Sequence, residues 1–227
     1  MVKVTASNLI RSTGLCAVLA GLLFVVIQPI HPADVLASVS TDAWAVIHYV
    51  SLVMVLLFVV GLIGIYARQV EELGWLGLAG LIVLSLGLLL TAGLGVVEVF
   101  VLPLLVESDP DFVNGFLGMV AGHPTGADLG AMPALWSASS ICFPAGTILF
   151  GIANLRAGIL SRWASGIFAF GFLVAAPVVA LLDTPRVAAV PVGIGLAWLG
   201  YSLWSEPRRP SESMQVTATA GPIVGGA

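Results

Sequence analysis

Six long stretches of the chain are almost entirely apolar, and short polar segments separate them. A bilayer core requires roughly 20 apolar residues per helix, and a backbone in lipid must satisfy its own hydrogen bonds. The pattern therefore predicts an all-α integral membrane bundle over residues 1–205. The six predicted transmembrane spans lie near residues 9–30, 43–67, 74–103, 134–155, 163–182 and 187–205.

Two segments outside these spans have patterns of their own. Asp109 and Pro110 form a helix-start signal, and Phe112 and Phe116 follow four residues apart. We expect a short interfacial helix at residues 110–121 whose two phenylalanines dip toward lipid or cover a cavity mouth. The tail, residues 206–227, is rich in Pro, Ser, Thr and Gly without an apolar period, which predicts a flexible cytoplasmic segment.

Basic residues gather on one side of the predicted membrane. When six spans alternate in direction, seven Lys and Arg residues fall on one side and only Arg186 falls on the other. Because short cytoplasmic loops carry an excess of Lys and Arg, this bias predicts a cytoplasmic-membrane protein with both termini in the cytoplasm. The seven residues are Lys3, Arg11, Arg68, Arg156, Arg162, Arg208 and Arg209.

The composition agrees with a membrane protein and excludes several other classes. Hydrophobic residues make up 59% of the chain and charged residues 9%, and the mean hydropathy is +1.10. The net charge of −4 and the sparse basic residues give no phosphate-binding patch, so we expect membrane lipid and no nucleic acid as a partner. Cys16 and Cys142 lie inside apolar runs and read as small buried apolar side chains.

Three titratable residues fall within or at the ends of spans. They are His48, Glu98 and Asp183. Inserting a charged side chain into the membrane costs about a few kcal/mol, so a residue of this kind is a candidate for a functional role. His48 and Glu98 lie at similar depth near the outer ends of the second and third spans, so we expect them to interact across neighbouring helices. Either could also be purely structural, since a buried pair can fix helix register. Asp183 is a further candidate acid, or a partner for Arg186 that closes a tight outer turn.

Uncharged polar residues lie at the same depth. We expect them to converge on a small cavity in the outer half of the bundle that opens outward. The alternative is that the hydroxyl groups bond back to the preceding helical turn and serve only helix packing. The candidate binding residues are Gln28, Ser51, Thr91, Trp136, Ser137 and Ser140.

The three histidines all map to the outer side. With Asp34, Glu98 or Asp128, the side chains of His31, His48 and His123 could supply a zinc sphere. The ligands lack a local spacing motif, and haem or nucleotide motifs are also missing from the sequence. We therefore expect neither a metal nor another cofactor.

Three short stretches of the first half of the chain resemble uncharacterised small prokaryotic multi-pass membrane proteins. They are residues 11–32, which end in His-Pro, residues 64–68 (Gly-Ile-Tyr-Ala-Arg) and residues 98–103. The resemblance implies a multi-pass membrane fold. That family has no assigned activity, so the resemblance transfers no catalytic residue.

These observations leave three functional hypotheses. The first is a protein that binds or moves a small apolar or amphipathic molecule through the outward cavity. The second is a membrane-embedded enzyme in which Glu98 or Asp183 acts as a general acid on a lipid or isoprenoid-like substrate while His48 orients it. The third is an accessory or structural membrane subunit.

Overall fold

The computed structural model describes residues 5–182 and 185–206. Within these residues every regular element is a helix, which confirms the all-α prediction. The six long helices are α1 (Ala6–Ile30), α3 (Asp42–Arg68), α4 (Val70–Val96), α7 (Met132–Ala157), α8 (Arg162–Leu182) and α9 (Ala189–Ser205). Short elements connect them: α2 (Leu36–Val39), a π-helix η1 (Val97–Val101), α5 (Leu102–Leu105), α6 (Pro110–Val120) and a 3-10 helix η2 (Pro185–Ala188).

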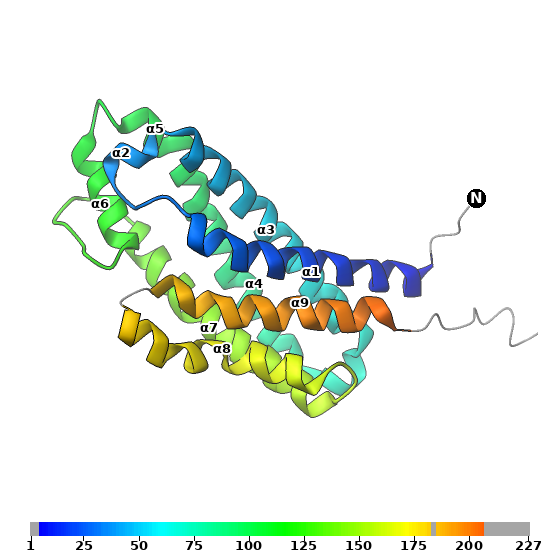
Figure 1. Ribbon diagram of the computed structural model, residues 1–227. Coiled ribbons are helices and arrows are strands. Elements are labelled where there is room, and N and C mark those ends of the chain that lie inside the picture. Colours follow the sequence, from blue (N-terminus) through cyan, green and yellow to red (C-terminus); the bar gives the residue numbers. More distant parts are fainter. Residues whose placement is uncertain (1–4, 183–184, 207–227) are drawn as a thin grey trace, which may run out of the picture.

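Five helical segments of the described chain are long and apolar enough to cross a membrane: α1, α3, the continuous run Val70–Leu105, α7, and Arg186–Ser205. Helix α8, apolar over Arg162–Ala175, packs beside them between α7 and α9. Figure 1 shows the long helices side by side. The first and last described helices begin and end at one end of the bundle, and α2, α5 and α6 cover the opposite end.

Glycines allow the main helix pairs to approach closely. A Cβ atom built on Gly21 of α1 would lie 2.4 Å from the carbonyl oxygen of Gly193 in α9. One built on Gly146 of α7 would lie 2.3 Å from the backbone nitrogen of Leu84 in α4. Because the groups in the way are backbone atoms, larger side chains would force the helices apart, and van der Waals packing is what holds helices together in lipid.

Polar contacts join the ends of helices at the end of the bundle where α1 begins and α9 ends. The Arg11 side chain donates to the Trp204 carbonyl oxygen, which ties α1 to α9. The Arg68 guanidinium contacts the Glu206 carboxylate at 2.5 Å, which ties α3 to the end of α9. These contacts close the bundle opposite the cavity described below.

Helix α6 forms where the sequence predicts it. Asp109 caps it by accepting a hydrogen bond from the Phe112 backbone N–H at 3.1 Å. Of the two orientations expected for Phe116, the one toward lipid is wrong, because its side chain is fully buried in a cluster with Trp44 and Leu102. The reason is that α6 packs against α2 and α5, so its apolar face has protein to cover. Phe116 does not line the cavity described below either.

Candidate functional site

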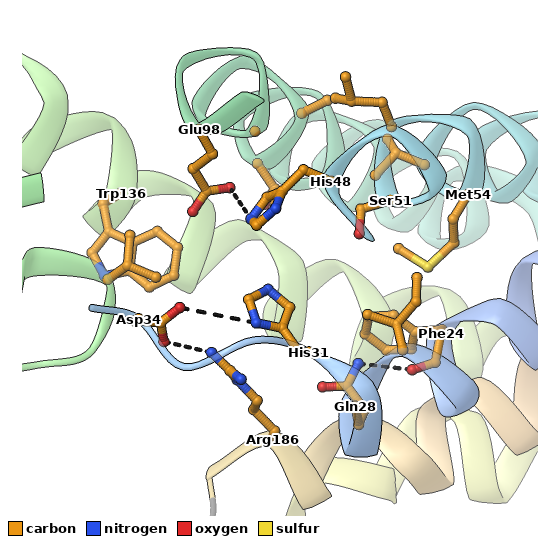
Figure 2. Close-up of a pocket in the computed structure, with 17 residues that line it drawn as sticks. Phe24, Gln28, His31, Asp34, His48, Ser51, Met54, Glu98, Trp136 and Arg186 are labelled. Carbon is orange, nitrogen blue, oxygen red and sulfur yellow. Dashed lines mark hydrogen bonds and ion pairs between the residues drawn. The ribbon is translucent and has the colours of Figure 1, made fainter. Parts of the chain in front are cut away.

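A cavity of about 280 Å³ lies between the long helices, near the end of the bundle where α6 lies. Side chains from α1, α3, α4, η1, α6, α7 and η2 line it. Figure 2 shows that the carboxylates of Glu98 and Asp34 lie at one end of the cavity with Trp136. Phe24 and Met54 lie at the other end, together with the uncharged polar side chains of Gln28 and Ser51.

Glu98 reaches the cavity from a π-helical turn. The N–H of Leu102 bonds to the carbonyl of Val97, five residues back, instead of four. Pro103 follows, and a proline has no N–H and clashes with the carbonyl four residues before it, so the regular helix pattern cannot continue through this point. The Trp44 indole N–H donates to the Glu98 carbonyl oxygen at 2.8 Å and fixes the turn against α3.

His48 and Glu98 contact each other, as the sequence predicts. The distance from His48 Nε2 to Glu98 Oε2 is 3.4 Å. The His48 side chain is only 3% exposed, and its Nδ1 lies 2.7 Å from the carbonyl oxygen of Trp44, one turn earlier in α3. This local bond fixes the ring so that Nε2 faces Glu98 (Figure 2).

The sequence did not predict an ion pair that forms part of the cavity lining. Arg186 of η2 donates to the Asp34 carboxylate, which belongs to the loop after α1, and also to the Pro32 carbonyl oxygen at 3.4 Å. His31, in the same loop, has its Nδ1 4.0 Å from Asp34. Burial lowers the pKa of His31 below its ordinary value of 6.5, and the nearby Arg186 charge adds to this, while the Pro32 carbonyl opposes it.

Six of the nine candidate catalytic and binding residues line the cavity: Gln28, His48, Ser51, Thr91, Glu98 and Trp136. Ser137 and Ser140 do not line it, and that prediction is wrong. Both side chains are exposed, and the Ser137 hydroxyl bonds back to the Pro133 carbonyl at 2.8 Å. Successive helix positions turn by roughly 100°, so a helix that directs Trp136 inward turns these serines outward. Asp183 lies outside the described residues.

The zinc sphere considered from the sequence would need three ligands close together in the described part of the chain. No group of three His, Cys, Asp or Glu residues there is arranged to hold an ion. His123 is exposed in the loop after α6, away from His31 and His48 in the cavity lining.

No family model, no curated protein and no solved structure matches the chain. Its function therefore has to be inferred from the cavity and the side chains that line it.

Proposed function

We propose that this is a cytoplasmic-membrane protein with six spans and both termini in the cytoplasm, in which α8 is the fifth span. The lateral packing of α8 between α7 and α9 supports the count. Arg68 ends α3 and Arg162 begins α8 at the bundle end where α1 begins and α9 ends, as the positive-inside bias requires.

Reporter fusions test this topology. Alkaline phosphatase joined after Trp204 should be inactive, and the same enzyme inserted near Asp128 should be active. The opposite pattern would overturn the orientation, and activity at both positions would overturn the helix count.

We further propose that the cavity binds a small amphipathic molecule from the outer side. The observation that carries this is the separation of charged and apolar linings within one cavity. A ligand with a polar head and a short apolar body would satisfy both parts. A volume of about 280 Å³ lies at the low end for small-molecule pockets, which favours a ligand the size of a short-chain lipid fragment.

Aromatic packing favours binding over free passage through the bundle. The Phe24 ring, at the apolar end of the cavity, makes edge-to-face contacts with Phe58 at 6.1 Å and with Phe143 at 5.8 Å between centroids. Phe58 is fully buried. These rings fill the middle of the bundle, so a ligand that enters the cavity meets a closed floor.

Two glycines of α4 provide a matched test. Gly95 lines the cavity, and a Cβ there would meet only the Leu52 side chain at 3.4 Å and the Glu98 carboxylate at 3.8 Å. A Cβ on Gly93, two residues earlier, would meet nothing within 4 Å. Gly95→Leu should therefore fill the cavity without pushing helices apart, whereas Gly93→Leu changes only the open face.

The assay is photolabelling of the detergent-purified protein with a diazirine-bearing octanol, followed by peptide mass spectrometry. Wild type and Gly93→Leu should be labelled on α3 and α4 residues of the cavity, and Gly95→Leu should lose that labelling. Equal labelling of Gly95→Leu would refute the cavity as the binding site. The absence of cavity labelling in wild type would instead favour an accessory or structural subunit.

A further inference from the structure

Several polar side chains in the cavity lining donate a hydrogen bond to the protein backbone. Five of these side chains are bonded to backbone carbonyl oxygens, four of them on the preceding turn of their own helix. The distances are 2.7 Å for Gln28, 2.7 Å for His31, 2.7 Å for His48, 2.8 Å for Ser51 and 2.9 Å for Thr91. A carbonyl oxygen can only accept, so each of these side chains is the donor. For His31, His48, Ser51 and Thr91 this bond uses the one polar hydrogen of the neutral side chain, so these four leave only acceptors for a ligand, whereas the Gln28 amide keeps one N–H.

The two histidines show this most clearly. Because Nδ1 of His48 donates to Trp44, its Nε2 is the nitrogen left for the cavity, and that buried atom makes no hydrogen bond. The same reasoning applies to His31, whose Nδ1 donates to Pro32 and whose other ring nitrogen points toward His48 in Figure 2. Burial keeps the pKa of His31 low, so this nitrogen carries a lone pair at neutral pH.

His48 and Glu98 must share a proton when the cavity is empty. A neutral Nε2 and an ionised carboxylate are both acceptors, and at 3.4 Å they would repel each other. One proton on either group removes the repulsion and leaves the pair with no net charge. The charged groups around the pair are Asp34 and Arg186, which neutralise each other. His31, the remaining titratable group beside the pair, is neutral.

We propose, resting on the binding function proposed above, that the cavity selects an amphipathic amine, whose ammonium group replaces the proton shared by His48 and Glu98. The three N–H groups of a primary ammonium match three acceptors: the Glu98 carboxylate and the free ring nitrogens of His48 and His31. The indole of Trp136 borders the same end of the cavity and offers an aromatic face to the cation. The aliphatic part of the amine lies toward Phe24 and Met54.

The exchange balances in atoms and charge. The empty site holds the pair with one proton and no net charge, and the free amine carries one positive charge. On binding, the proton leaves to solvent, the carboxylate becomes ionised, and its negative charge is matched by the ammonium. Binding of each amine is thus coupled to release of one proton, and the cavity stays neutral throughout.

Calorimetric titration of the detergent-purified protein with octylamine and with octanol tests the exchange. The titrations are run at one pH in two buffers with different heats of ionisation. The difference between the two measured binding heats gives the number of protons released per ligand. We expect roughly one proton per octylamine and none per octanol, and an octylamine affinity that rises about tenfold per pH unit while the pair retains its proton. Octylamine binding without proton release in wild type would overturn the exchange, whatever the variants do.

Two carboxylate variants in neighbouring elements complete the test. Glu98→Gln should keep octanol binding, lose proton release and bind octylamine at least tenfold more weakly. Glu107→Gln, at an exposed position after α5, should behave as wild type. Unchanged octylamine binding in Glu98→Gln would overturn the proposed exchange. Octanol binding in the same variant would still support the cavity as a ligand-binding site. Failure of both probes to bind wild type would overturn the cavity function and the exchange together.

Discussion

Replacing Gly87 of α4 by alanine should destabilise the bundle. A Cβ there would lie 2.6 Å from the backbone nitrogen of Phe143 in α7, whereas ordinary contact begins at 3.4 Å. The helices would have to separate locally by 3.4 − 2.6 = 0.8 Å. A gap of that order forfeits a quarter to a half of the dispersion energy of the contacts it opens, and overpacking typically costs about 1–3 kcal/mol. The interface between α4 and α7 is the most extensive helix–helix interface in the described chain. The substitution therefore weakens the main packing interaction of the bundle.

Gly93→Ala on the same helix is the matched control, because a Cβ there meets nothing within 4 Å. Both substitutions gain the same helix propensity, so their difference isolates the packing cost. Reversible unfolding in mixed detergent and SDS micelles, followed by circular dichroism, should place Gly87→Ala roughly 1–3 kcal/mol below Gly93→Ala. Free energies of unfolding that agree within about 0.5 kcal/mol would refute the close packing of α4 on α7.

Three further predictions concern polar groups that are buried or half-buried. Trp44→Phe should lower the free energy of unfolding by about 1–3 kcal/mol, because it leaves the Glu98 carbonyl without its 2.8 Å indole donor. Asn154→Leu should cost a similar amount, since the buried Gln69 amide loses its 2.5 Å acceptor, and adding Gln69→Leu should recover part of the loss. The lowered pKa of His31 means that the unfolded chain binds its proton more readily than the folded one. Stability should therefore fall as pH drops below about 6.5, and His31→Asn should make that fall shallower.

The same micelle unfolding assay checks all three predictions, and each has an outcome that contradicts it. Wild-type stability in Trp44→Phe would mean that the π-helical turn does not depend on the indole. In Asn154→Leu the Gln69 side-chain N–H group has lost its acceptor. A double leucine variant less stable than Asn154→Leu alone would contradict the idea that this unpaired group causes the loss of stability. An identical pH dependence in His31→Asn and wild type would show that His31 titrates alike in the folded and unfolded chain.

The sequence predicted best those features that depend on the length of a span or on the depth of a residue along it. Span length and hydropathy placed the long helices, and depth along the second and third spans was enough to bring His48 to Glu98. The proline at position 103 was the available signal for the π-helical turn. It does not by itself say whether a helix bends, ends or takes an extra residue into one turn.

The rest depends on contacts between distant segments. Asp34 and Arg186 are 152 residues apart in sequence, and a pattern within either segment carries no information about the other. Packing against α4 determines which face of α7 points into the bundle. Hydrophobic periodicity could not predict this face, because α7 carries apolar residues on all of its sides. Phe116 is buried because α2 and α5 lie beside α6, an arrangement set by the whole loop rather than by α6 itself.

The most direct test of the cavity as a ligand site is nitrogen NMR of the protein labelled in its histidine rings. The chain has only three histidines, so the spectrum is simple, and His123, exposed outside the cavity lining, is an internal control. Titration with octylamine should shift the ring nitrogens of His48 and His31 and leave those of His123 unchanged. Unchanged signals of His48 at saturating octylamine, or equal shifts at all three rings, would contradict binding at the polar end of the cavity.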